Sequence, residues 1–456
     1  MQRLIHYTFG FAASMVMLTS CDKMLEYDPG DVIIAEDALR TPDDAQRLLN
    51  SNYDVLANLY NGRVQAVAEL MTDNLSIPNN NNDLTSVYNR ETNFFTGYTN
   101  GVYTDFYRAI YRGNVLLENF DLIEGLGEAE RTRMEAEVRF IRALCHWQVV
   151  KLWAQPYGYT ADNSHLGIPV REEASQTPLP RATVAEVYDA ILTDLEFARN
   201  NLPTENGNYA NRYAAFALSA HVAFLTNDLG STVAYANEVI NSGAFVLEST
   251  IDRYPSGTVN PETIFGIVSS LIDNRSTAFR DLFRSDNNPS PTLIFSPDVA
   301  AILGQNPSDT RNDWYTQTGG NALVARFNGK EFFNIPVLHL TGLMLVRAEA
   351  LARSGQPLEN AIADINAVRE RAFGAGINQL PSDANADEVT EAARLELRKE
   401  TLCEGTWIDH VKRLGTLGEP MTVRGAPWDC PGMALQFPNG ETSAAGFILN
   451  PEGGCL

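Results

Sequence analysis

The stretch Glu135-Ala136-Glu137-Val138-Arg139-Phe140-Ile141-Arg142-Ala143-Leu144 decides the fold of this chain. It lies within residues 130–153, where apolar residues recur every three or four positions: Met134, Val138, Ile141, Cys145, Val149 and Leu152. Such steps place the side chains on one face of an α-helix. Glu135 stands four residues before Arg139, the spacing of a helical ion pair on the solvent side. The stretch therefore predicts a long amphipathic helix.

Further helices are predicted on the C-terminal side by the same periodicity. They cover residues 183–203, 211–226, 232–241, 337–353, 358–372 and 386–413. The first of them starts at a capping-box pattern, Thr183-Val184-Ala185-Glu186. Polar, irregular stretches lie at 76–103, 155–180, 249–330 and 416–456, with short strands expected at 263–268 and 322–327. We expect a mainly α fold of paired helices, like a solenoid of helical hairpins, with long loops and few short strands.

The first 21 residues have the pattern of an export signal that ends at Cys21. Arg3 precedes an apolar run from Phe9 to Leu18, which is too short to span a bilayer core of roughly 30 Å. Such a run fits the apolar region of a secretory signal peptide, and Thr19-Ser20-Cys21 resembles a bacterial lipobox. We predict a lipoprotein signal peptide over residues 1–20 and acyl chains on Cys21. The alternative is an ordinary secretory signal with a chance cysteine.

The net charge of the chain argues against two kinds of binding partner, nucleic acid and anionic lipid. The 456 residues carry a formal net charge of −23. Nucleic acid is bound through Lys and Arg side chains that neutralise phosphates, so this acidic surface argues against a nucleic-acid partner. It also argues against adsorption to anionic lipid, which leaves the acyl chains as the membrane attachment.

The remaining cysteines show no CxxC spacing, which argues against a zinc or thioredoxin-type site. Cys145 and Cys403 lie in apolar helical contexts and are expected to be core thiols. Cys430 and Cys455 both lie in the Gly- and Pro-rich tail of a chain that we expect to be exported. A disulfide between these two is one hypothesis, and two free thiols are the other.

Several sequence blocks, taken in order, resemble the SusD/RagB family of surface lipoproteins along nearly the whole chain. These blocks are Cys21-Asp22-Lys23-Met24-Leu25-Glu26-Tyr27-Asp28-Pro29, Tyr107-Arg108-Ala109-Ile110-Tyr111-Arg112-Gly113-Asn114, Glu135 to Leu144, Leu179-Pro180-Arg181-Ala182-Thr183 with Asp194-Leu195, and Asp364-Ile365-Asn366-Ala367-Val368-Arg369-Glu370-Arg371-Ala372. The block from Glu135 to Leu144 is similar to the family's A-E-x-R-F-x-R-A and is the most specific. Any single block is weak, but their shared order is a strong signal.

The chain departs from the family pattern at two places. Leu338 is followed by His339 where the family helix usually begins Leu-Arg-x-x-E, and Gly342 stands where the acid is expected. Near the end, Glu404-Gly405-Thr406-Trp407 lacks the arginine of the family's E-G-x-R block. These departures concern binding specificity more than fold.

The resemblance implies a SusD-like fold built on TPR-like helical hairpins. Residues 1–20 would be the signal peptide and 21–456 a single SusD-like domain. Its hairpin scaffold would cover about 36–245 and 335–415, its loop-rich ligand-binding insertions about 76–103 and 249–330, and its irregular tail 416–456. The implied function is capture of glycan or peptide at the outer face of the outer membrane. The chain would act as the lid of a SusC-like, TonB-dependent barrel.

Two loop regions, 79–107 and 309–315, supply the side chains that sugar binding needs. Flat aromatic faces cover C–H patches, and Asn, Asp or Arg side chains bind hydroxyl groups. The candidate ligand-binding residues are Asn82, Tyr88, Arg90, Phe94, Tyr98, Arg311, Asn312, Trp314 and Tyr315. A solvated loop is the alternative for the asparagine run at 79–82, and a core position is the alternative for Trp314.

The sequence gives little support for a catalytic site or a metal site. The histidines form no HExxH pattern, and Ser219 lacks a Gly-x-Ser-x-Gly setting. Glu135 and Glu137 fall on different helix faces and each has an arginine within helical reach, which favours ion pairs over an acid–base dyad. We expect no enzyme activity, no cofactor and no metal.

Two rival functions stay open. The first is a lipid-anchored scaffold whose TPR-like hairpins bind another protein. Burial of Trp314 and Tyr98, with an apolar groove elsewhere, would favour it. The second is a surface glycosidase, which would need two carboxylates facing each other at about 5–5.5 or 6.5–9.5 Å.

Overall fold

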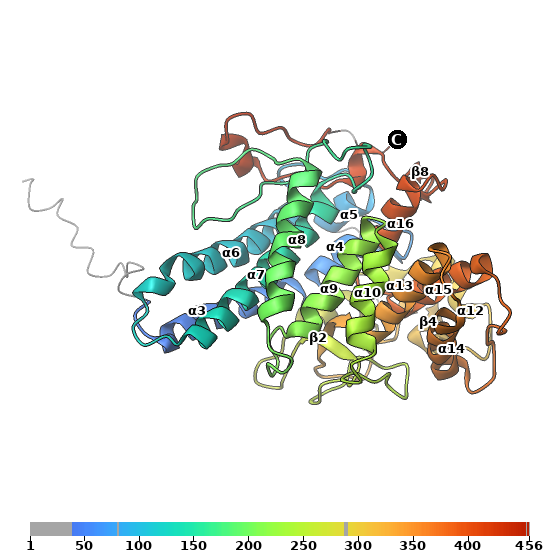
Figure 1. Cartoon of the computed structure of the whole chain (residues 1–456). Coiled ribbons are helices and arrows are strands. Elements are labelled where there is room, and N and C mark those ends of the chain that lie inside the picture. Colours follow the sequence, from blue (N-terminus) through green and yellow to red (C-terminus); the bar gives the residue numbers. More distant parts are fainter. Residues whose placement is uncertain (1–38, 80–81, 287–290, 453, 456) are drawn as a thin grey trace, which may run out of the picture.

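The computed structural model describes residues 39–79, 82–286, 291–452 and 454–455, and this part of the chain is mainly helical (Figure 1). The predicted fold class is therefore confirmed. The predicted signal peptide and Cys21 lie outside the described residues. No helix in the described part is both long and apolar enough to cross a bilayer.

The first half of the described chain is a set of helices that pack side by side. They are α3 (Pro42–Leu59), α4 (Arg63–Leu70), α5 (Asn82–Tyr88), α6 (Gly97–Asn119), α7 (Glu128–Trp153), α8 (Val184–Asn201), α9 (Arg212–Leu225) and α10 (Leu229–Ile240). α6 packs against both α3 and α7, α7 packs against α8, and α9 packs against α10 (Figure 1). The interval 76–103, which we predicted to be irregular, contains all of α5 and the first turns of α6.

α7 is the long helix predicted from the opening stretch. Its apolar stripe, from Met134 to Leu152, is fully buried. On the solvent side Arg139 Nη2 lies 2.8 Å from Glu135 Oε1, as the spacing predicts. The capping box that begins α8 is also present, since the Thr183 side chain accepts from the Glu186 amide and the Glu186 carboxylate accepts from the Thr183 amide. Such local signals define helix starts without tertiary information.

Three of the sequence blocks meet at one buried ion pair. Arg142 on α7 forms a two-pronged pair with Asp194 on α8, with N–O distances of 2.7 Å. Arg142 Nη1 also donates to Asn114 Oδ1 on α6 at 2.8 Å. Because planar guanidinium and carboxylate groups match in geometry, this contact sets how the three helices pack.

The second half contains α11 (Thr277–Phe283), α12 (Pro297–Gly304), α13 (Leu340–Arg353), α14 (Glu359–Phe373), α15 (Ala386–Glu400) and α16 (Trp407–Thr416). The single helix predicted over 386–413 is wrong, because the chain breaks between α15 and α16. There Cys403 and Gly405 take positive φ angles of 68° and 76°, which an α-helix does not accommodate. Likewise, Val337 and Leu338 belong to strand β6 (Ile335–His339), and the helix begins after it.

The strands are short and fall into three sheets. They are β1 (Leu75–Ser76), β2 (Thr263–Ile267), β3 (Ile294–Phe295), β4 (Tyr315–Thr318), β5 (Asn321–Val324), β6, β7 (Thr422–Val423) and β8 (Ala426–Pro427). β2 pairs with β6, β7 pairs with β8, and the remaining strands form a sheet in the order β1-β3-β5-β4. β2 and β5 lie where the sequence predicts strands.

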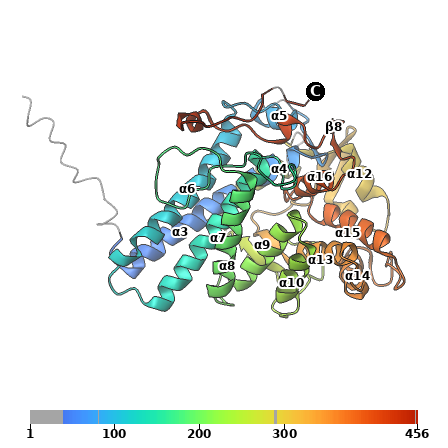
Figure 2. The ribbon, with the colours of Figure 1, turned by 45° about the horizontal axis from the view of Figure 1, so that its top comes forward.

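The C-terminal tail crosses the top of the molecule beside α5 (Figure 2). Gly432 approaches the Arg90 carbonyl so closely that a Cβ at this position would lie 2.0 Å from the oxygen. Arg424 stacks on the Tyr88 ring at 4.1 Å. The predicted disulfide is present between Cys430 and Cys455, whereas Cys145 and Cys403 are buried free thiols. The tail is therefore fastened to the loop after α5.

Candidate functional site

Antiparallel pairing brings together segments that are far apart in the chain. Leu75 and Ser76 pair with Phe295 and Ile294, and Phe295 pairs in turn with Ala322. The β4–β5 hairpin turns at Gly319 and Gly320, whose φ angles are 59° and 85°. Tight hairpin turns need positive φ at their central residues, which glycine adopts without strain. The two predicted insertions, 76–103 and 249–330, thus share one sheet.

An open groove of about 470 Å³ lies beside this sheet. We call it the hairpin groove, and it is lined by Ser76, Ile294, Phe295, Pro297, Ala300, Ala301, Gln317, Gly320, Asn321 and Ala322. Its floor is apolar, while Gln317 and Asn321 are exposed at its rim. Amide side chains both donate and accept hydrogen bonds. No ionisable side chain lines the groove among the described residues, so it suits a neutral ligand rich in hydroxyl groups.

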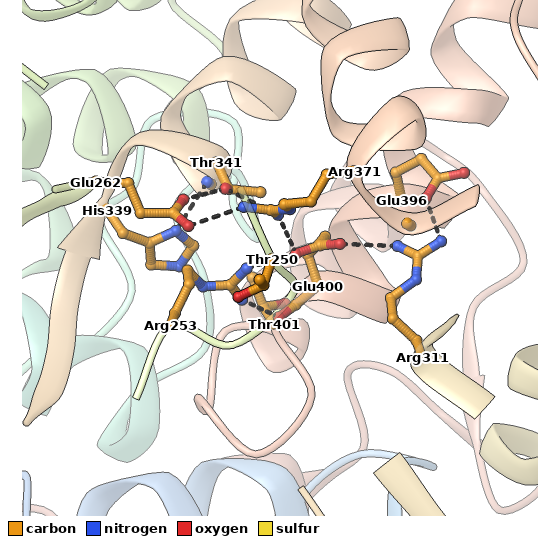
Figure 3. Close-up of polar contacts among 12 residues, drawn as sticks. Thr250, Arg253, Glu262, Arg311, His339, Thr341, Arg371, Glu396, Glu400 and Thr401 are labelled. Carbon is orange, nitrogen blue, oxygen red and sulfur yellow. Dashed lines mark hydrogen bonds and ion pairs between the residues drawn. The ribbon is translucent and has the colours of Figure 1, made fainter. Parts of the chain in front are cut away.

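Arg311 is not available to a ligand, and its prediction as a ligand-binding residue is wrong. Its side chain is fully buried, with N–O distances of 2.8 Å to Asp309 and Glu396 and 2.9 Å to Glu400. Figure 3 shows the guanidinium of Arg311 pointing toward Glu396 and Glu400. Each nitrogen of the Arg311 guanidinium group thus pairs with a carboxylate oxygen.

Glu400 is the centre of this buried network (Figure 3). Its carboxylate pairs with Arg253, Arg311 and Arg371. Burial by itself raises the pKa of Glu400, but the guanidiniums of Arg371, Arg253 and Arg311 outweigh this and hold the pKa well below its usual range. Arg371 continues the network to Glu262 at 2.8 Å. The cluster joins α14, α15 and the loops around β2, which is a structural role.

Trp314 is also in the core, so its prediction as a stacking platform is wrong. Only 4% of the residue is exposed, and the Arg326 guanidinium lies 4.0 Å from the ring centroid. The backbone amide of Ala325 donates to the Trp314 carbonyl at 2.7 Å and closes the chain over the ring. Polar sequence neighbours do not expose a side chain when a second segment packs on top of it.

The N-terminal candidates divide into covered and half-buried side chains. Arg90 is buried at a positive φ of 61°, and one face of Tyr88 is covered by Arg424. The structure therefore removes Arg90 from the candidates, while Tyr88 is half-buried and stays a prediction. Asn82 begins α5, and its side chain lies outside what the structure describes.

Phe94 on the loop before α6 and Tyr98 in the first turn of α6 are both half-buried. Tyr98 donates its amide to Asp83 Oδ2 at 2.8 Å, and burial raises the pKa of its hydroxyl to about 12. Phe94 lies 4.2 Å from the ring of Phe95, whose exposed fraction is 77%. Phe95 belongs to the predicted loop region 79–107 and is the more exposed ring of this pair. Neither predicted residue lines the hairpin groove.

Asn312 lies in the helical turn before β4 and Tyr315 is the first residue of β4, and both are half-buried. Their roles as ligand-binding residues stay predictions. Asn312 Nδ2 donates to the Asn306 carbonyl at 2.9 Å. The residues missed in this region are Gln317 and Asn321. The Gly319-Gly320 pair between them was the available signal, since two glycines between short alternating segments indicate a hairpin.

The first departure from the family pattern has a structural explanation. His339 Nδ1 accepts from the Gly342 amide at 3.1 Å and so caps α13. Its Nε2 lies 2.9 Å from Glu404 Oε2. A Cβ on Gly342 would meet the His339 ring at 3.2 Å. The histidine cap therefore favours glycine at position 342, because a Cβ there would crowd the His339 ring.

Nowhere in the described residues do three or more His, Cys, Asp or Glu side chains gather as a metal site would require.

Comparison with known proteins identifies the family of this chain. Residues 35–225 match a family model described as starch-binding and associating with the outer membrane, and residues 324–435 match the SusD family model. The chain belongs to the SusD/RagB family. The recognition from sequence blocks is confirmed.

Relatives within this family are distant in sequence. SusD-like protein P38 of Formosa agariphila is 24% identical, over 90% of this chain and 91% of that protein. SusD-like protein P25 of the same organism is 24% identical over 54% of this chain, and the match spans about half (49%) of its own length.

Solved structures of the family share the fold. A SusD superfamily protein from Bacteroides thetaiotaomicron has a TM-score of 0.80 at 21% identity, covering 90% of this chain and 100% of that chain. Surface glycan-binding protein A from Bacteroides uniformis has a TM-score of 0.73 at 18% identity, covering 90% of this chain and 99% of that chain.

Proposed function

We propose that this protein is a non-enzymatic, lipid-anchored outer-membrane protein that captures an oligosaccharide and passes it to a SusC-like, TonB-dependent barrel. In this proposal Cys21 carries the acyl chains, residues 1–20 are removed, and residues 21–456 act as one SusD-like lid at the cell surface. The ligand is held non-covalently and no cofactor takes part.

The hairpin groove is the observation that carries the proposal. Its rim offers the amides of Gln317 and Asn321, and its floor is apolar. Sugars present hydroxyl groups at their edges and C–H patches on their faces, so this combination suits them. Support also comes from the family, which includes the surface glycan-binding protein of Bacteroides uniformis.

The groove also argues against a glycosidase. Hydrolysis of a glycosidic bond needs a pair of carboxyl groups on either side of the bond. The described lining of the hairpin groove contains no Asp or Glu.

The scaffold hypothesis is weakened by the shape of the cavities. Trp314 is buried, as that hypothesis expects, but the mostly apolar cavity among the helices has a volume of only about 70 Å³. A docked helix has a diameter of about 10–12 Å with its side chains and does not fit there.

The binding test is calorimetry of the purified protein against a panel of neutral and acidic oligosaccharides, with peptides as a second arm. For the best oligosaccharide we expect the double variant Gln317→Ala/Asn321→Ala to weaken binding by about tenfold, since each lost hydrogen bond contributes about 0.5–1.5 kcal/mol. Asn208→Ala, an amide lining a different pocket, is the matched control. Equal affinities of the double variant and the control would reject the groove as the site.

The partner test is a pull-down of the lipidated protein from outer membranes. We expect a TonB-dependent barrel to be recovered with it. The Cys21→Ser variant, which lacks the lipid attachment residue, separates recovery through the membrane from recovery through direct contact. Absence of any barrel from the wild-type sample would contradict the lid hypothesis and leave the binding result untouched.

A further inference from the structure

A cavity of about 70 Å³ lies between the two segments that the family models match. We call it the interhelical cavity. Its walls come from α4, α7 and α9 on one side and from β6, α13, α15 and α16 on the other. Apolar side chains such as Leu144, Phe224 and Leu397 make up most of the wall.

Four buried polar atoms that belong to residues lining this cavity have no hydrogen-bond partner among the described residues: Gln65 Oε1, Trp147 Nε1, Thr406 Oγ1 and His410 Nδ1. Gln65, Trp147 and His410 are each at least 95% buried as residues. The orientation of the Gln65 amide is set by its Nε2, which donates to the Tyr60 carbonyl at 2.9 Å. Buried polar groups are almost always paired, so four orphans around one cavity indicate a missing partner.

The chemistry of these atoms defines what the partner must offer. The indole N–H of Trp147 can only donate, and the Gln65 oxygen can only accept. The Thr406 hydroxyl can do either. A hydroxyl group on a ligand is able to satisfy any of these atoms, because it donates and accepts at once.

The charged groups at the cavity already have partners. Lys151 Nζ lies 2.8 Å from Asp409 Oδ2, and Glu404 Oε2 lies 2.9 Å from His339 Nε2. Burial lowers the pKa of both His221 and His410 to about 3, so these rings are neutral at pH 7. An ionic ligand would lose its hydration without gaining a counter-ion, which excludes it on energetic grounds.

From these observations we propose that the interhelical cavity binds a small neutral polyol of two or three carbons. The volume decides the size, since one water needs roughly 10–15 Å³ and this cavity holds only a few times that. A cluster of waters is the competing occupant. Each water requires two to four polar partners, and the mostly apolar wall provides too few of them. The carbon atoms of a polyol contact that wall instead.

The test uses the indole N–H signals of the purified protein labelled with ¹⁵N-tryptophan, titrated with ethylene glycol, glycerol and glucose. The chain has five tryptophans, and the Trp147→Phe variant assigns the relevant signal. We expect a saturable shift of the Trp147 signal with ethylene glycol and glycerol, and no saturable shift with glucose, which is too large. A linear shift shared by all five signals, or no shift with either small polyol, would overturn the proposal and leave water as the occupant.

Thr406→Val is the decisive variant, because Thr406 makes no capping hydrogen bond to α16 and valine keeps its shape. We expect its dissociation constant for glycerol to rise on the order of fivefold, the loss of one hydrogen bond. Thr193→Val, at an exposed position on α8, is the matched control. Should Thr406→Val fold poorly, Gln65→Met removes a different orphan and is expected to give the same result. Unchanged affinity in a folded variant would contradict the proposed site.

Discussion

Arg311 Nη1 lies 2.9 Å from Glu400 Oε1 across 89 residues of sequence, and both side chains are completely buried. Arg253 and Arg371 reach the other oxygen of the same carboxylate. One carboxylate thus contacts three buried guanidinium groups, each of which also pairs with at least one other carboxylate. Breaking such a pair leaves uncompensated charge in a low-dielectric interior, which is far more costly than losing an exposed pair.

The first prediction concerns this carboxylate. Glu400→Gln is expected to lower the free energy of unfolding by about 3–5 kcal/mol, because three buried guanidinium groups each lose one charged partner at once. Urea denaturation followed by circular dichroism measures the change. Asp121→Asn, which removes an exposed partner of Arg131, is the control and should leave the stability nearly unchanged. Similar effects of the two substitutions would contradict a central role for Glu400.

The second prediction separates packing from ligand binding at Trp314. Trp314→Ala is expected to destabilise the fold by about 3–5 kcal/mol, because it leaves a cavity under Arg326. Affinity of the folded protein for its oligosaccharide should stay the same, as measured by calorimetry well below the melting temperature. A large loss of affinity with unchanged stability would restore Trp314 as a ligand platform.

The third prediction is a pH dependence at His146. Burial, with a smaller effect of Arg142, lowers the pKa of His146 to about 3, and its Nε2 accepts from the Arg171 amide at 3.3 Å. Between pH 6.5 and 3 the unfolded chain binds this proton and the folded chain does not. Stability therefore falls as the pH drops below 6.5, by about 1.4 kcal/mol per unit for this group.

The variant His146→Gln tests this dependence. Its loss of stability between pH 6.5 and pH 4.5 should be smaller than that of the wild type by about 2.3 kcal/mol, from urea unfolding at both values. His221 and His410 titrate equally in both proteins, so they cancel in the difference. Parallel pH profiles for the two proteins would show that His146 stays protonated or leaves the core on acidification.

The fourth prediction concerns the tail disulfide. The Cys430–Cys455 bridge closes a loop with a sequence separation of 25, which in the chain-entropy model corresponds to about 3–4 kcal/mol. The double variant Cys430→Ser/Cys455→Ser should therefore expose the tail and the loop around Arg90 to faster amide exchange. Exchange in α14, which packs against α13 and α15, is the internal control. Unchanged exchange around Arg90 would show that the tail holds its place without the bridge.

The helices were predictable because their signals are local. The three- and four-residue steps in α7, the ion pair of Glu135 with Arg139 and the capping box at Thr183 all operate within one or two turns. The order of the family blocks added the fold. The break between α15 and α16 escaped prediction because the apolar period continues through it, while the positive φ angles at Cys403 and Gly405 follow from packing.

The sequence by itself thus determined the helical architecture and the family, and it predicted the loop regions that we propose to bind ligand. Only the tertiary structure decided which side chains in those regions face solvent. The sheet that joins Ser76 to Ile294 and, through Phe295, to Ala322 creates the hairpin groove, and the carboxylates around Arg311 draw that side chain inward. Pairing and burial between distant segments depend on long-range contacts, which cannot be predicted from local periodicity.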